Sequence, residues 1–441
     1  MGRVARLFSA LYLGLLCAMS LGAVSASDST QFSRREPHPK RSLRRLHTSP
    51  LTRSYAPVFP PWYLYVWCGP DDKTSADFLA VFNVDTFGLG TRPPTLLGVV
   101  KVPTQGNEPH HLYLDRDGKN LYAGGLLSGS LGQDSNFFFS LENPREPQLV
   151  TSSDVDDATA ADAAYALPNG GFLVTMMSGR KLGDSGRVVE YDANYNLVAE
   201  YPSGGDVPSQ FYPHGIAVNE AANYMVTTDF VDLWSTLEPS KAPNFVDTVR
   251  VWDLHNRTIL HTLSLGSDAQ GIMDVVFVEG TDCDQCAIAS SASNGKLYLI
   301  DPINGIAQVA FDTHSRNSGL HVMAVNRARN RIWVTAAGTG HVYMLDASLA
   351  RNLRLLSSVS LGSGAVPHFI TLSPDESMVL VSDYFLEQHG RGMVHSGGDR
   401  QVHFIQVEGD AMTLLPDMSL DFKRLFSNIG IVNPHGMATR T

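Results

Sequence analysis

The sequence predicts an all-β protein built as a seven-bladed β-propeller, and three observations lead to this prediction. From Trp62 onward, short hydrophobic β-type runs alternate with segments rich in Gly, Asn, Asp and Pro, without a sustained helical pattern. The runs gather in fours that recur roughly every 45 to 55 residues, a spacing typical of propeller blades. Three runs near the N-terminus and one at the C-terminus remain, and together they complete a seventh group of four.

Six groups of four expected strands follow one another along the chain, separated by turn-forming residues. The first three groups comprise residues 111–115, 121–125, 137–141 and 148–151; 163–167, 172–176, 188–192 and 197–201; and 214–218, 224–229, 249–254 and 259–265. The next three comprise residues 273–278, 287–292, 296–301 and 306–311; 321–325, 331–336, 341–346 and 355–361; and 368–372, 378–383, 401–407 and 412–420. In the seventh blade, residues 435–439 join 63–67, 78–85 and 96–102, which closes the ring and leaves only short, protected sheet edges.

The N-terminus has the features of a secretory signal. Arg3 and Arg6 precede an apolar run over residues 7–21, and Val24-Ser25-Ala26 supplies the small residues that a signal peptidase needs. The alternative is a membrane anchor, but the apolar run is shorter than the about 20 residues that a span requires. The sequence therefore predicts a signal peptide over 1–26 and a secreted or extracytoplasmic protein that has no membrane association after cleavage.

Residues 27–58 are polar and basic and lack hydrophobic periodicity, which predicts a disordered leader or propeptide before a propeller over 59–441. Within the leader, Arg41-Ser42-Leu43-Arg44 resembles the Arg-x-Leu-Arg host-targeting element of secreted pathogen effectors. The alternative is that this tetrad belongs to a solvated, arginine-rich linker.

The net charge of −11 and the absence of a basic stripe in the propeller region argue against nucleic-acid binding. Of the four cysteines, Cys17 leaves with the signal, so that Cys68, Cys283 and Cys286 remain. The spacing of Cys283 and Cys286 predicts a local disulfide in a secreted chain, rather than a metal clip, because no second cysteine pair exists. Asn256-Arg257-Thr258 is an acceptor sequence for N-glycosylation between two outer strands.

Histidines recur where expected blades begin. These histidines are His110 and His111, His214, His321, His368 and His435, and most of them follow a proline. Counted from His111, His214, His321 and His368, the second strand of the blade opens nine residues later. A single histidine at a strand start usually caps a turn or bonds a carbonyl group, but five at one phase of a repeat indicate a metal or substrate site. The off-phase histidines His255, His261, His314, His341 and His403 are expected to be structural or solvent-facing.

The first strand of a propeller blade is innermost, so these histidines are expected to encircle one mouth of the central channel. Alignment on the second strands adds Asp162, and it adds Asp274 if the Cys283–Cys286 turn is an insertion. The predicted ring is His110 or His111, Asp162, His214, Asp274, His321, His368 and His435. Converging imidazoles favour copper, zinc, nickel or iron over calcium or magnesium, and a secreted chain suits copper. Some ring residues are expected to orient ligands or hold substrate.

Two long connections, residues 230–248 and 384–400, are expected on the same face as the ring, as lids or as mobile surface segments. Asp229, Trp234, Asp383 and Tyr384 are the candidate covering residues. Cys68 is also expected near this face, either as a ligand or redox group or as a small buried hydrophobic residue.

Several segments resemble the family of selenium-binding proteins and methanethiol oxidases over about residues 62–441. The segments are Tyr63-Leu64-Tyr65-Val66-Trp67-Cys68, the run from Asp77 to Asp85, Pro109-His110-His111, Val251-Trp252-Asp253-Leu254, Thr262-Leu263-Ser264-Leu265, Pro367-His368-Phe369 and Pro434-His435-Gly436. The resemblance implies a seven-bladed propeller that uses copper to convert methanethiol, oxygen and water to formaldehyde, hydrogen sulfide and hydrogen peroxide. It also implies export, as in bacterial members, and it places Cys68 where animal members carry a cysteine linked to selenium binding. The family usually offers a histidine near Asp162, whereas this chain has none between His111 and His214.

The leading hypothesis is therefore a secreted copper oxidoreductase acting on a small thiol or selenium compound. Its metal-ligand candidates are the six ring histidines, and its catalytic candidates are Cys68, Asp162 and Asp274. A non-catalytic propeller that binds copper or selenium, or that scaffolds a partner, is the alternative. A propeller lactonase is disfavoured, because that class gathers Glu, Asn and Asp around an axial calcium ion. The sequence has neither a phosphate-binding glycine loop nor a nucleophile elbow.

Overall fold

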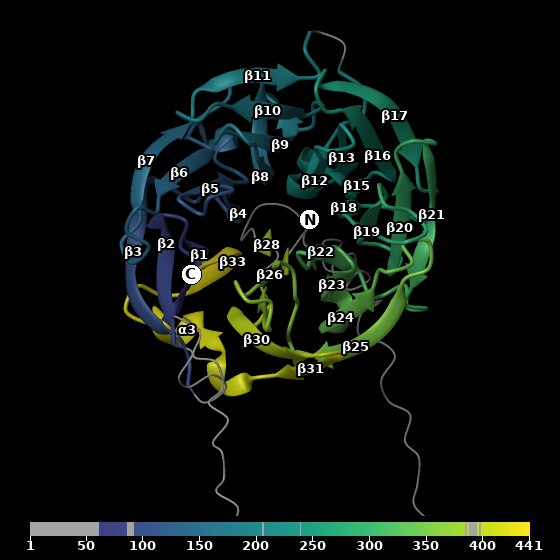
Figure 1. Cartoon of the computed structure of the whole chain (residues 1–441). Coiled ribbons are helices and arrows are strands. Elements are labelled where there is room, and N and C mark those ends of the chain that lie inside the picture. Colours follow the sequence, from purple (N-terminus) through teal and green to yellow (C-terminus); the bar gives the residue numbers. More distant parts are fainter. Residues whose placement is uncertain are drawn as a thin grey trace, which may run out of the picture. The chain divides into compact units, whose positions relative to one another are not determined.

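Seven antiparallel sheets surround one axis as the blades of a propeller (Figure 1), as the strand pattern predicts. The computed structural model describes residues 61–85, 92–204, 207–238, 240–383 and 398–441, and the backbone of 386–387 and 395–396. The predicted signal peptide, the basic leader with its Arg41–Arg44 tetrad, and Tyr384 lie outside these residues. None of the helices in the described part of the chain is long and apolar enough to cross a membrane.

Each blade runs from an innermost strand at the axis to an outer strand at the rim. The strands of blades 1 to 3 are β4 (Pro109–Leu114), β5 (Asn120–Gly125), β6 (Asn136–Ser140) and β7 (Gln148–Ser153); β8 (Ala158–Ala166), β9 (Phe172–Gly179), β10 (Arg187–Tyr191) and β11 (Leu197–Tyr201); and β12 (Pro213–Asn219), β13 (Tyr224–Asp229), β16 (Thr248–Asp253) and β17 (Thr258–Ser264). Those of blades 4 to 6 are β18 (Ile272–Phe277), β19 (Ala287–Ser291), β20 (Lys296–Asp301) and β21 (Ile306–Asp312); β22 (Leu320–Val325), β23 (Arg331–Ala336), β24 (His341–Asp346) and β25 (Arg354–Ser360); and β26 (Ile370–Leu372), β27 (Met378–Ser382), β30 (Gln401–Glu408) and β31 (Ala411–Leu414).

The seventh blade joins the two ends of the fold, as predicted. Its strands are β33 (Val432–Arg440), β1 (Trp62–Pro70), β2 (Ala76–Val84) and β3 (Thr95–Gln105). β33 pairs with β1 in a register that runs from Tyr63 opposite Arg440 to Pro70 opposite Val432. In Figure 1 the yellow β33 lies beside the purple β1. The innermost strand of the seventh blade, which comes from the C-terminus, thus has a hydrogen-bonded neighbour from the N-terminal part of the chain.

The connections between strands contain a few short elements. They are η2 (Gly129–Leu131), β14 (Val231–Asp232), α2 (Leu233–Leu237), β15 (Asn244–Phe245), η3 (Ala337–Thr339), β28 (Leu386–Glu387), β29 (His395–Ser396), η4 (Pro416–Met418), β32 (Leu420–Asp421) and α3 (Phe422–Leu425). The expected outer strand over 412–420 is wrong in its second half, where Pro416 has no N–H to donate and the chain turns into η4. After η4 the chain returns to the sheet as β32, which pairs with β30.

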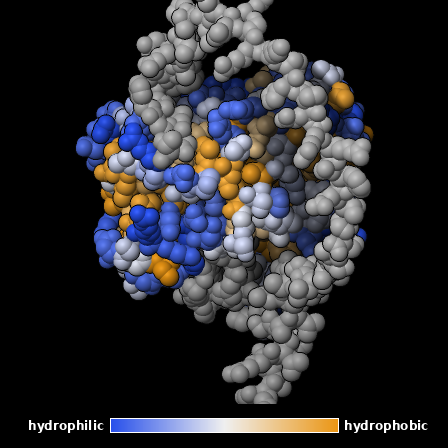
Figure 2. All heavy atoms as spheres, turned by 90° about the horizontal axis from the view of Figure 1, so that it is seen from below, coloured by the Kyte–Doolittle hydropathy of each residue, from blue (hydrophilic) through white to orange (hydrophobic). Residues whose placement is uncertain are grey.

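Hydrophobic residues fill the space between adjacent blades. Trp67, Trp252 and Trp333 are at most 2% exposed, and each packs in a cluster that joins strands of two or three blades. On the outer surface, hydrophobic side chains are interspersed among hydrophilic ones (Figure 2). The outward-facing side chains of Val150 and Val198 on the outermost strands β7 and β11 are more than half exposed. Burial between blades rather than within one sheet is what ties the repeats into a ring.

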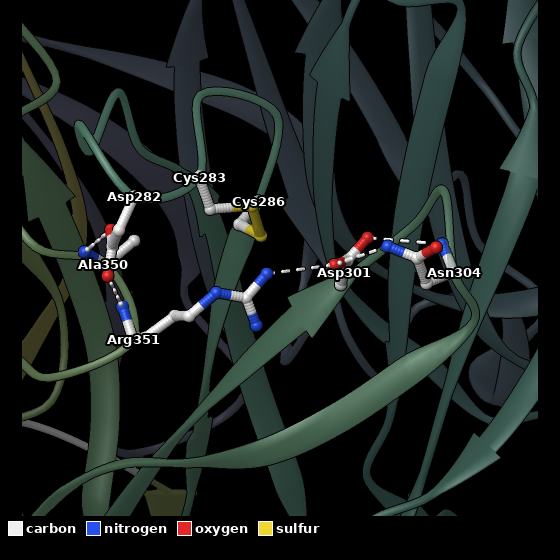
Figure 3. The surroundings of a disulfide bond; sticks show 7 residues. All are labelled: Asp282, Cys283, Cys286, Asp301, Asn304, Ala350 and Arg351. Atoms are coloured by element: carbon white, nitrogen blue, oxygen red, sulfur yellow. Dashed lines mark hydrogen bonds and ion pairs between the residues drawn. A yellow bond between two sulfur atoms is a disulfide. The ribbon is translucent and has the colours of Figure 1, made fainter.

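The predicted disulfide between Cys283 and Cys286 is confirmed. It closes the turn before β19, and the turn docks on the neighbouring blade (Figure 3). Asp282 accepts hydrogen bonds from the backbone N–H groups of Ala350 (2.7 Å) and Arg351 (3.1 Å). The guanidinium of Arg351 in turn lies 3.2 Å from the carboxylate of Asp301. The disulfide therefore supports a contact between blades 4 and 5.

Replacing both cysteines by alanine is expected to lower the free energy of unfolding by at most about 2 kcal/mol. The reason is that the closed loop is short, so its closure removes little entropy from the unfolded chain. Denaturant titration of the variant and of the wild type, each with and without reductant, checks this. Reductant should lower the free energy of unfolding of the wild type by a similar amount and leave that of the variant unchanged. A loss above about 4 kcal/mol would contradict the prediction, because it exceeds what so short a loop provides.

Candidate metal centre

The innermost strands share a β-bulge that turns one side chain toward the axis. In blade 3, Pro213 pairs with Asp229 and Ile216 with Thr227, so two residues of β12 oppose a single residue of β13. The same shift occurs in β4, β8, β18, β22 and β33. Bulges re-aim side chains next to functional sites. In blade 6, regular pairing begins at Ile370. His368 lies two residues before it, at the same spacing as the equivalent residues of the other blades.

The residue two positions before regular pairing is therefore equivalent in all seven blades. These residues are His110, Asp162, His214, Met273, His321, His368 and His435. The prediction that Asp274 occupies the ring is wrong, because the bulge of β18 places Met273 there and Asp274 one residue later. His111 likewise follows the ring position, which His110 occupies.

Hydroxyl groups opposite the bulges connect four of the ring residues to the preceding blade. Thr175 donates to the carbonyl of His214 (2.5 Å), and Thr228 donates to that of Met273 (2.9 Å). Two further pairs follow the same pattern, namely Ser290 with His321 (2.6 Å) and Thr335 with His368 (2.7 Å). These four hydroxyl groups fix the height of successive ring residues along the axis.

A Thr335→Val variant is expected to lose about 1 to 3 kcal/mol of unfolding free energy. Valine keeps the shape of the side chain but leaves the buried carbonyls of His368 and Val322 without their shared donor. Chemical denaturation measures the change, and Thr413→Val on the exposed face of β31 is the control. Equal stabilities of the two variants would show that the hydroxyl bridge contributes nothing.

The carboxylate of Asp162 lies among three imidazoles. Its Oδ1 is 2.8 Å from His111 Nδ1, and its Oδ2 is 3.3 Å from both His110 Nε2 and His214 Nε2. A neutral imidazole is favoured to carry its proton on the nitrogen that faces the negatively charged carboxylate, and its other ring nitrogen points away from Asp162. The prediction that Asp162 belongs to the ring is thus matched by its position, and Asp162 is fully buried.

The remaining ring histidines close the circle. The ring centroids of His110 and His435 are 4.2 Å apart, and those of His368 and His435 are 4.8 Å apart. Two overlapping groups each bring four ligand atoms within 4.8 Å of one another: His110, His111, His368 and His435, and His110, His111, Asp162 and His214. Both groups are buried, and either could bind a metal ion.

Burial determines the charge of this centre. It lowers the pKa of His214 and that of His321 to about 3 each, and burial together with neighbouring histidines holds the pKa of His368 and His435 well below the usual range. Burial on its own raises the pKa of Asp162, but the surrounding imidazoles outweigh it and lower this pKa well below its ordinary value. His214, His321, His368 and His435 are therefore neutral imidazoles and Asp162 is a carboxylate, which suits binding of a cation.

Three nitrogens support this interpretation. His110 Nδ1, His111 Nε2 and His214 Nδ1 are buried and have no hydrogen-bond partner among the described residues. A buried polar atom without a partner costs about 1 to 3 kcal/mol, so three of them in one place require an explanation. Each is the ring nitrogen opposite the one that faces Asp162, which is the arrangement of a metal-binding histidine oriented by a carboxylate.

The structure places the other three predicted site residues outside the two groups. His321 Nδ1 lies 3.1 Å from His368 Nδ1, so His321 is in a position to orient His368. Asp274 accepts the N–H groups of Met323 (2.7 Å) and Val275 (2.8 Å). Cys68 is buried in a hydrophobic cluster, its thiol donates to the Val66 carbonyl (3.2 Å), and burial raises its pKa. This is the environment of a small buried hydrophobic residue, the second of the two alternatives for Cys68.

A hydrophobic cap covers the ring on the face of the connections between second and third strands. It consists of Leu126, Leu127, Ala160, Met177, Phe230, Val231, Leu233 and Met273. The Phe230 ring lies 5.1 Å from that of His214. Residues 230–238 thus form a cover, as one alternative predicted, whereas Trp234 is 38% exposed on its outside.

Asp229 and Asp383, the other candidate covering residues, instead fix the segments that precede two ring histidines. Asp229 accepts the N–H of Tyr212 (2.9 Å) and pairs with Arg250 (2.9 Å). Asp383 accepts the N–H of Val366 at the equivalent place in blade 6. Neither carboxylate covers the ring, because both are buried within their own blades.

His403 occupies the position of Arg250 in blade 6 and faces Asp399 at 3.3 Å. It is 3% exposed, so it is structural rather than solvent-facing. With Asp383 and Asp399 it forms a third group whose ligand atoms lie within 4.8 Å of one another.

Two features of the site had sequence signals that pattern analysis missed. Gly271-Ile272-Met273 and Gly319-Leu320-His321 share a glycine two residues before the ring, and both glycines have a positive φ (70° and 54°). Aligning them identifies Met273 as the ring residue, because the left-handed backbone recurs there. A hydroxyl residue at one phase of the second strand is the signal for the inter-blade bridges.

No protein-family model and no curated protein matches this sequence. Solved structures match it in fold. A hypothetical selenium-binding protein from Sulfolobus tokodaii is similar over 86% of this chain and 94% of its own, with a TM-score of 0.69 and 14% identity. The periplasmic gluconolactonase of Pseudomonas aeruginosa is similar over 87% and 99%, with a TM-score of 0.61 and 13% identity. A putative 6-phosphogluconolactonase from Bacteroides uniformis is similar over 86% and 99%, with a TM-score of 0.60 and 12% identity.

At these identities the likeness concerns the fold alone, because one fold carries many functions. The chain thus shares its propeller with a hypothetical selenium-binding protein and with lactonases, and it has buried histidine groups that could bind a metal ion.

Proposed function

We propose that this protein is a copper-dependent oxidoreductase of the methanethiol oxidase type, which oxidises a small thiol with O2. One observation carries the proposal: a buried carboxylate orients three imidazoles whose opposite nitrogens have no described hydrogen-bond partner. Such a site is costly to bury unless a cation completes it. The motifs shared with the methanethiol oxidase family give the reaction.

The donor set fits copper. His110, His111, His368 and His435 would hold the ion, since their ligand atoms lie within 4.8 Å of one another and all are imidazole nitrogens. Imidazole suits copper, zinc and iron, whereas calcium and magnesium require oxygen ligands. When bound, copper supplies redox chemistry toward thiolate and oxygen. Its identity rests on the all-nitrogen donors and on the signal peptide that we propose exports the chain.

The surrounding residues provide a protected environment. Asp162 holds the proton on His111 Nδ1, which leaves Nε2 with its lone pair. His321 orients His368 through their Nδ1 atoms. The hydrophobic cap excludes water from the face above the ring, which strengthens electrostatic interactions inside and retains reactive products.

The proposed reaction consumes one thiol, one O2 and one water. With methanethiol the carbon becomes formaldehyde and the sulfur leaves as hydrogen sulfide. O2 takes up the two electrons and becomes hydrogen peroxide. A selenium compound of the same size is the other substrate that the family resemblance suggests.

A second candidate is a propeller that binds copper or selenium without turnover. Burial of every ring residue to 6% exposure or less favours it, because storage needs no substrate access. A lactonase, as the names of two similar structures suggest, is disfavoured. The axis carries imidazoles and a single ring carboxylate, whereas a calcium site needs six to eight oxygen ligands.

The test is metal analysis of the purified protein followed by incubation with methanethiol and oxygen. We expect copper close to one per chain, and peroxide and hydrogen sulfide that appear only when thiol is present. Copper without thiol consumption would favour the storage alternative. Protein that neither retains nor takes up copper would overturn the proposal.

A further inference from the structure

A cavity of about 470 Å³ lies in the channel on the other side of the histidine ring from the cap. Its walls are the parts of the innermost strands that follow the ring, such as Leu112 of β4 and Met437 of β33. Its rim includes Arg327 and Glu376, which belong to turns between first and second strands. The cavity therefore reaches the face of the propeller opposite the long connections.

Two of the cavity-lining residues also touch the centre. The Tyr113 hydroxyl lies 3.4 Å from His111 Nδ1, and the Phe369 ring centroid lies 5.0 Å from that of His111. The inner end of the cavity is thus in contact with a histidine that belongs to both four-residue groups.

On the side of the cap, the described residues of the hydrophobic cluster are closely packed. Leu126, Met177, Val231 and Leu233 are at most 3% exposed, and Phe230 packs directly on His214. The sequence predicts the histidine ring at that mouth, with the long connections on the same face. The described residues provide a cavity at the opposite end of the channel.

The walls select for a small ligand with little charge. Most cavity-lining side chains are apolar, including Leu112, Ile216, Val322 and Phe369. The carboxylate of Asp274 is already engaged by two backbone N–H groups. At the rim, Glu376 accepts the N–H of Arg327 (2.7 Å). A volume of 470 Å³ is within the range of small-molecule pockets, about 300 to 1,000 Å³.

We infer that this cavity is the substrate chamber of the histidine centre, that thiols reach the centre from the face opposite the cap, and that the chamber discriminates against charged thiols such as glutathione. The inference rests on the proposed function, to which it adds the side of approach and the discrimination against charge. Desolvation of an alkyl group against these walls favours binding, whereas each charge brought into them is costly.

The test narrows the chamber without changing the centre. Ala324→Trp and Thr371→Trp place an indole on two different strands of the wall, and Ala411→Trp on the exposed face of β31 is the matched control. Ethanethiol binding to metal-free protein is followed by saturation-transfer NMR. The kcat/KM of the copper-loaded protein is measured for methanethiol, ethanethiol and glutathione. Circular dichroism and copper content verify that each variant is folded and loaded.

We expect saturation transfer to ethanethiol in the wild type and in Ala411→Trp and its loss in both chamber variants. The kcat/KM for ethanethiol should fall by at least about tenfold in the chamber variants, and glutathione should be a poor substrate throughout. If ethanethiol binds in the chamber but loaded protein does not oxidise it, the proposed function fails and the chamber stands. If the wild type shows no saturation transfer, or if both chamber variants oxidise ethanethiol normally, the chamber is overturned while the oxidase stands.

Discussion

A His368→Ala, His435→Ala double variant is expected to purify without stoichiometric copper, with an affinity lowered by more than about 100-fold. Two of four imidazoles in the all-histidine group are then missing, and the loss of groups that only orient ligands already costs 10- to 100-fold. Elemental analysis gives the bound metal. In the wild type, free copper at about 100 times its Kd should add about 2.7 kcal/mol of stability, and the double variant should lack this shift.

The control for this variant is His403→Ala. His403 is also a buried histidine, but it lies in the third strand of blade 6, away from the ring. The His403→Ala variant should retain copper. Its stability is expected to be lower, because truncating a buried side chain leaves a cavity. If His403→Ala loses the metal and the double variant keeps it, the ion belongs to the group of Asp383, Asp399 and His403 instead.

Much of the fold could be predicted because a propeller repeats one local pattern. Each blade contains four short strands with their own turns, and the period of the runs is visible without any tertiary information. The closing blade followed from counting, since one strand at the C-terminus and three at the N-terminus complete a sheet. The convergence of the histidines followed from the same repeat, because equivalent residues of all blades meet at the axis.

The parts that could not be predicted depend on strand register at the level of a single residue. The bulge that separates Met273 from Asp274 inserts one residue into the pairing of β18 with β19, and hydrophobic alternation does not record it. Cys68 was ambiguous for a related reason. The hydrophobic cluster that contains the thiol includes residues of blade 6, such as Val381 and Phe404, and only the folded ring brings them together.

The cap and the chamber were beyond sequence analysis for a different reason. Leu126, Met177 and Leu233 come from three different blades, and no local pattern marks them as one cluster. The consequence for function is large. A ring that is open at the mouth would admit a wide range of substrates, whereas a covered ring with a narrow apolar channel behind it restricts them.

Asp162→Asn is expected to lower copper affinity by about 10- to 100-fold, or about 1.4 to 3 kcal/mol, without unfolding the protein. Asparagine keeps the size of the side chain but removes the single negative charge at the centre. Its amide N–H groups would also face the nitrogens of His110, His111 or His214 that now lie 2.8 to 3.3 Å from the carboxylate. At least one imidazole must then change tautomer, and its lone pair turns away from the ion.

Competitive titration against a copper chelator measures this change, and Asp274→Asn is the matched control. Asp274 is one residue beyond the ring position and accepts only backbone N–H groups among its described hydrogen bonds. Its replacement should change the affinity by less than about twofold, because it orients no imidazole. If the two variants bind copper equally well, Asp162 does not orient the ligands. The tautomers of His110, His111, His368 and His435 would then be set by one another rather than by a carboxylate.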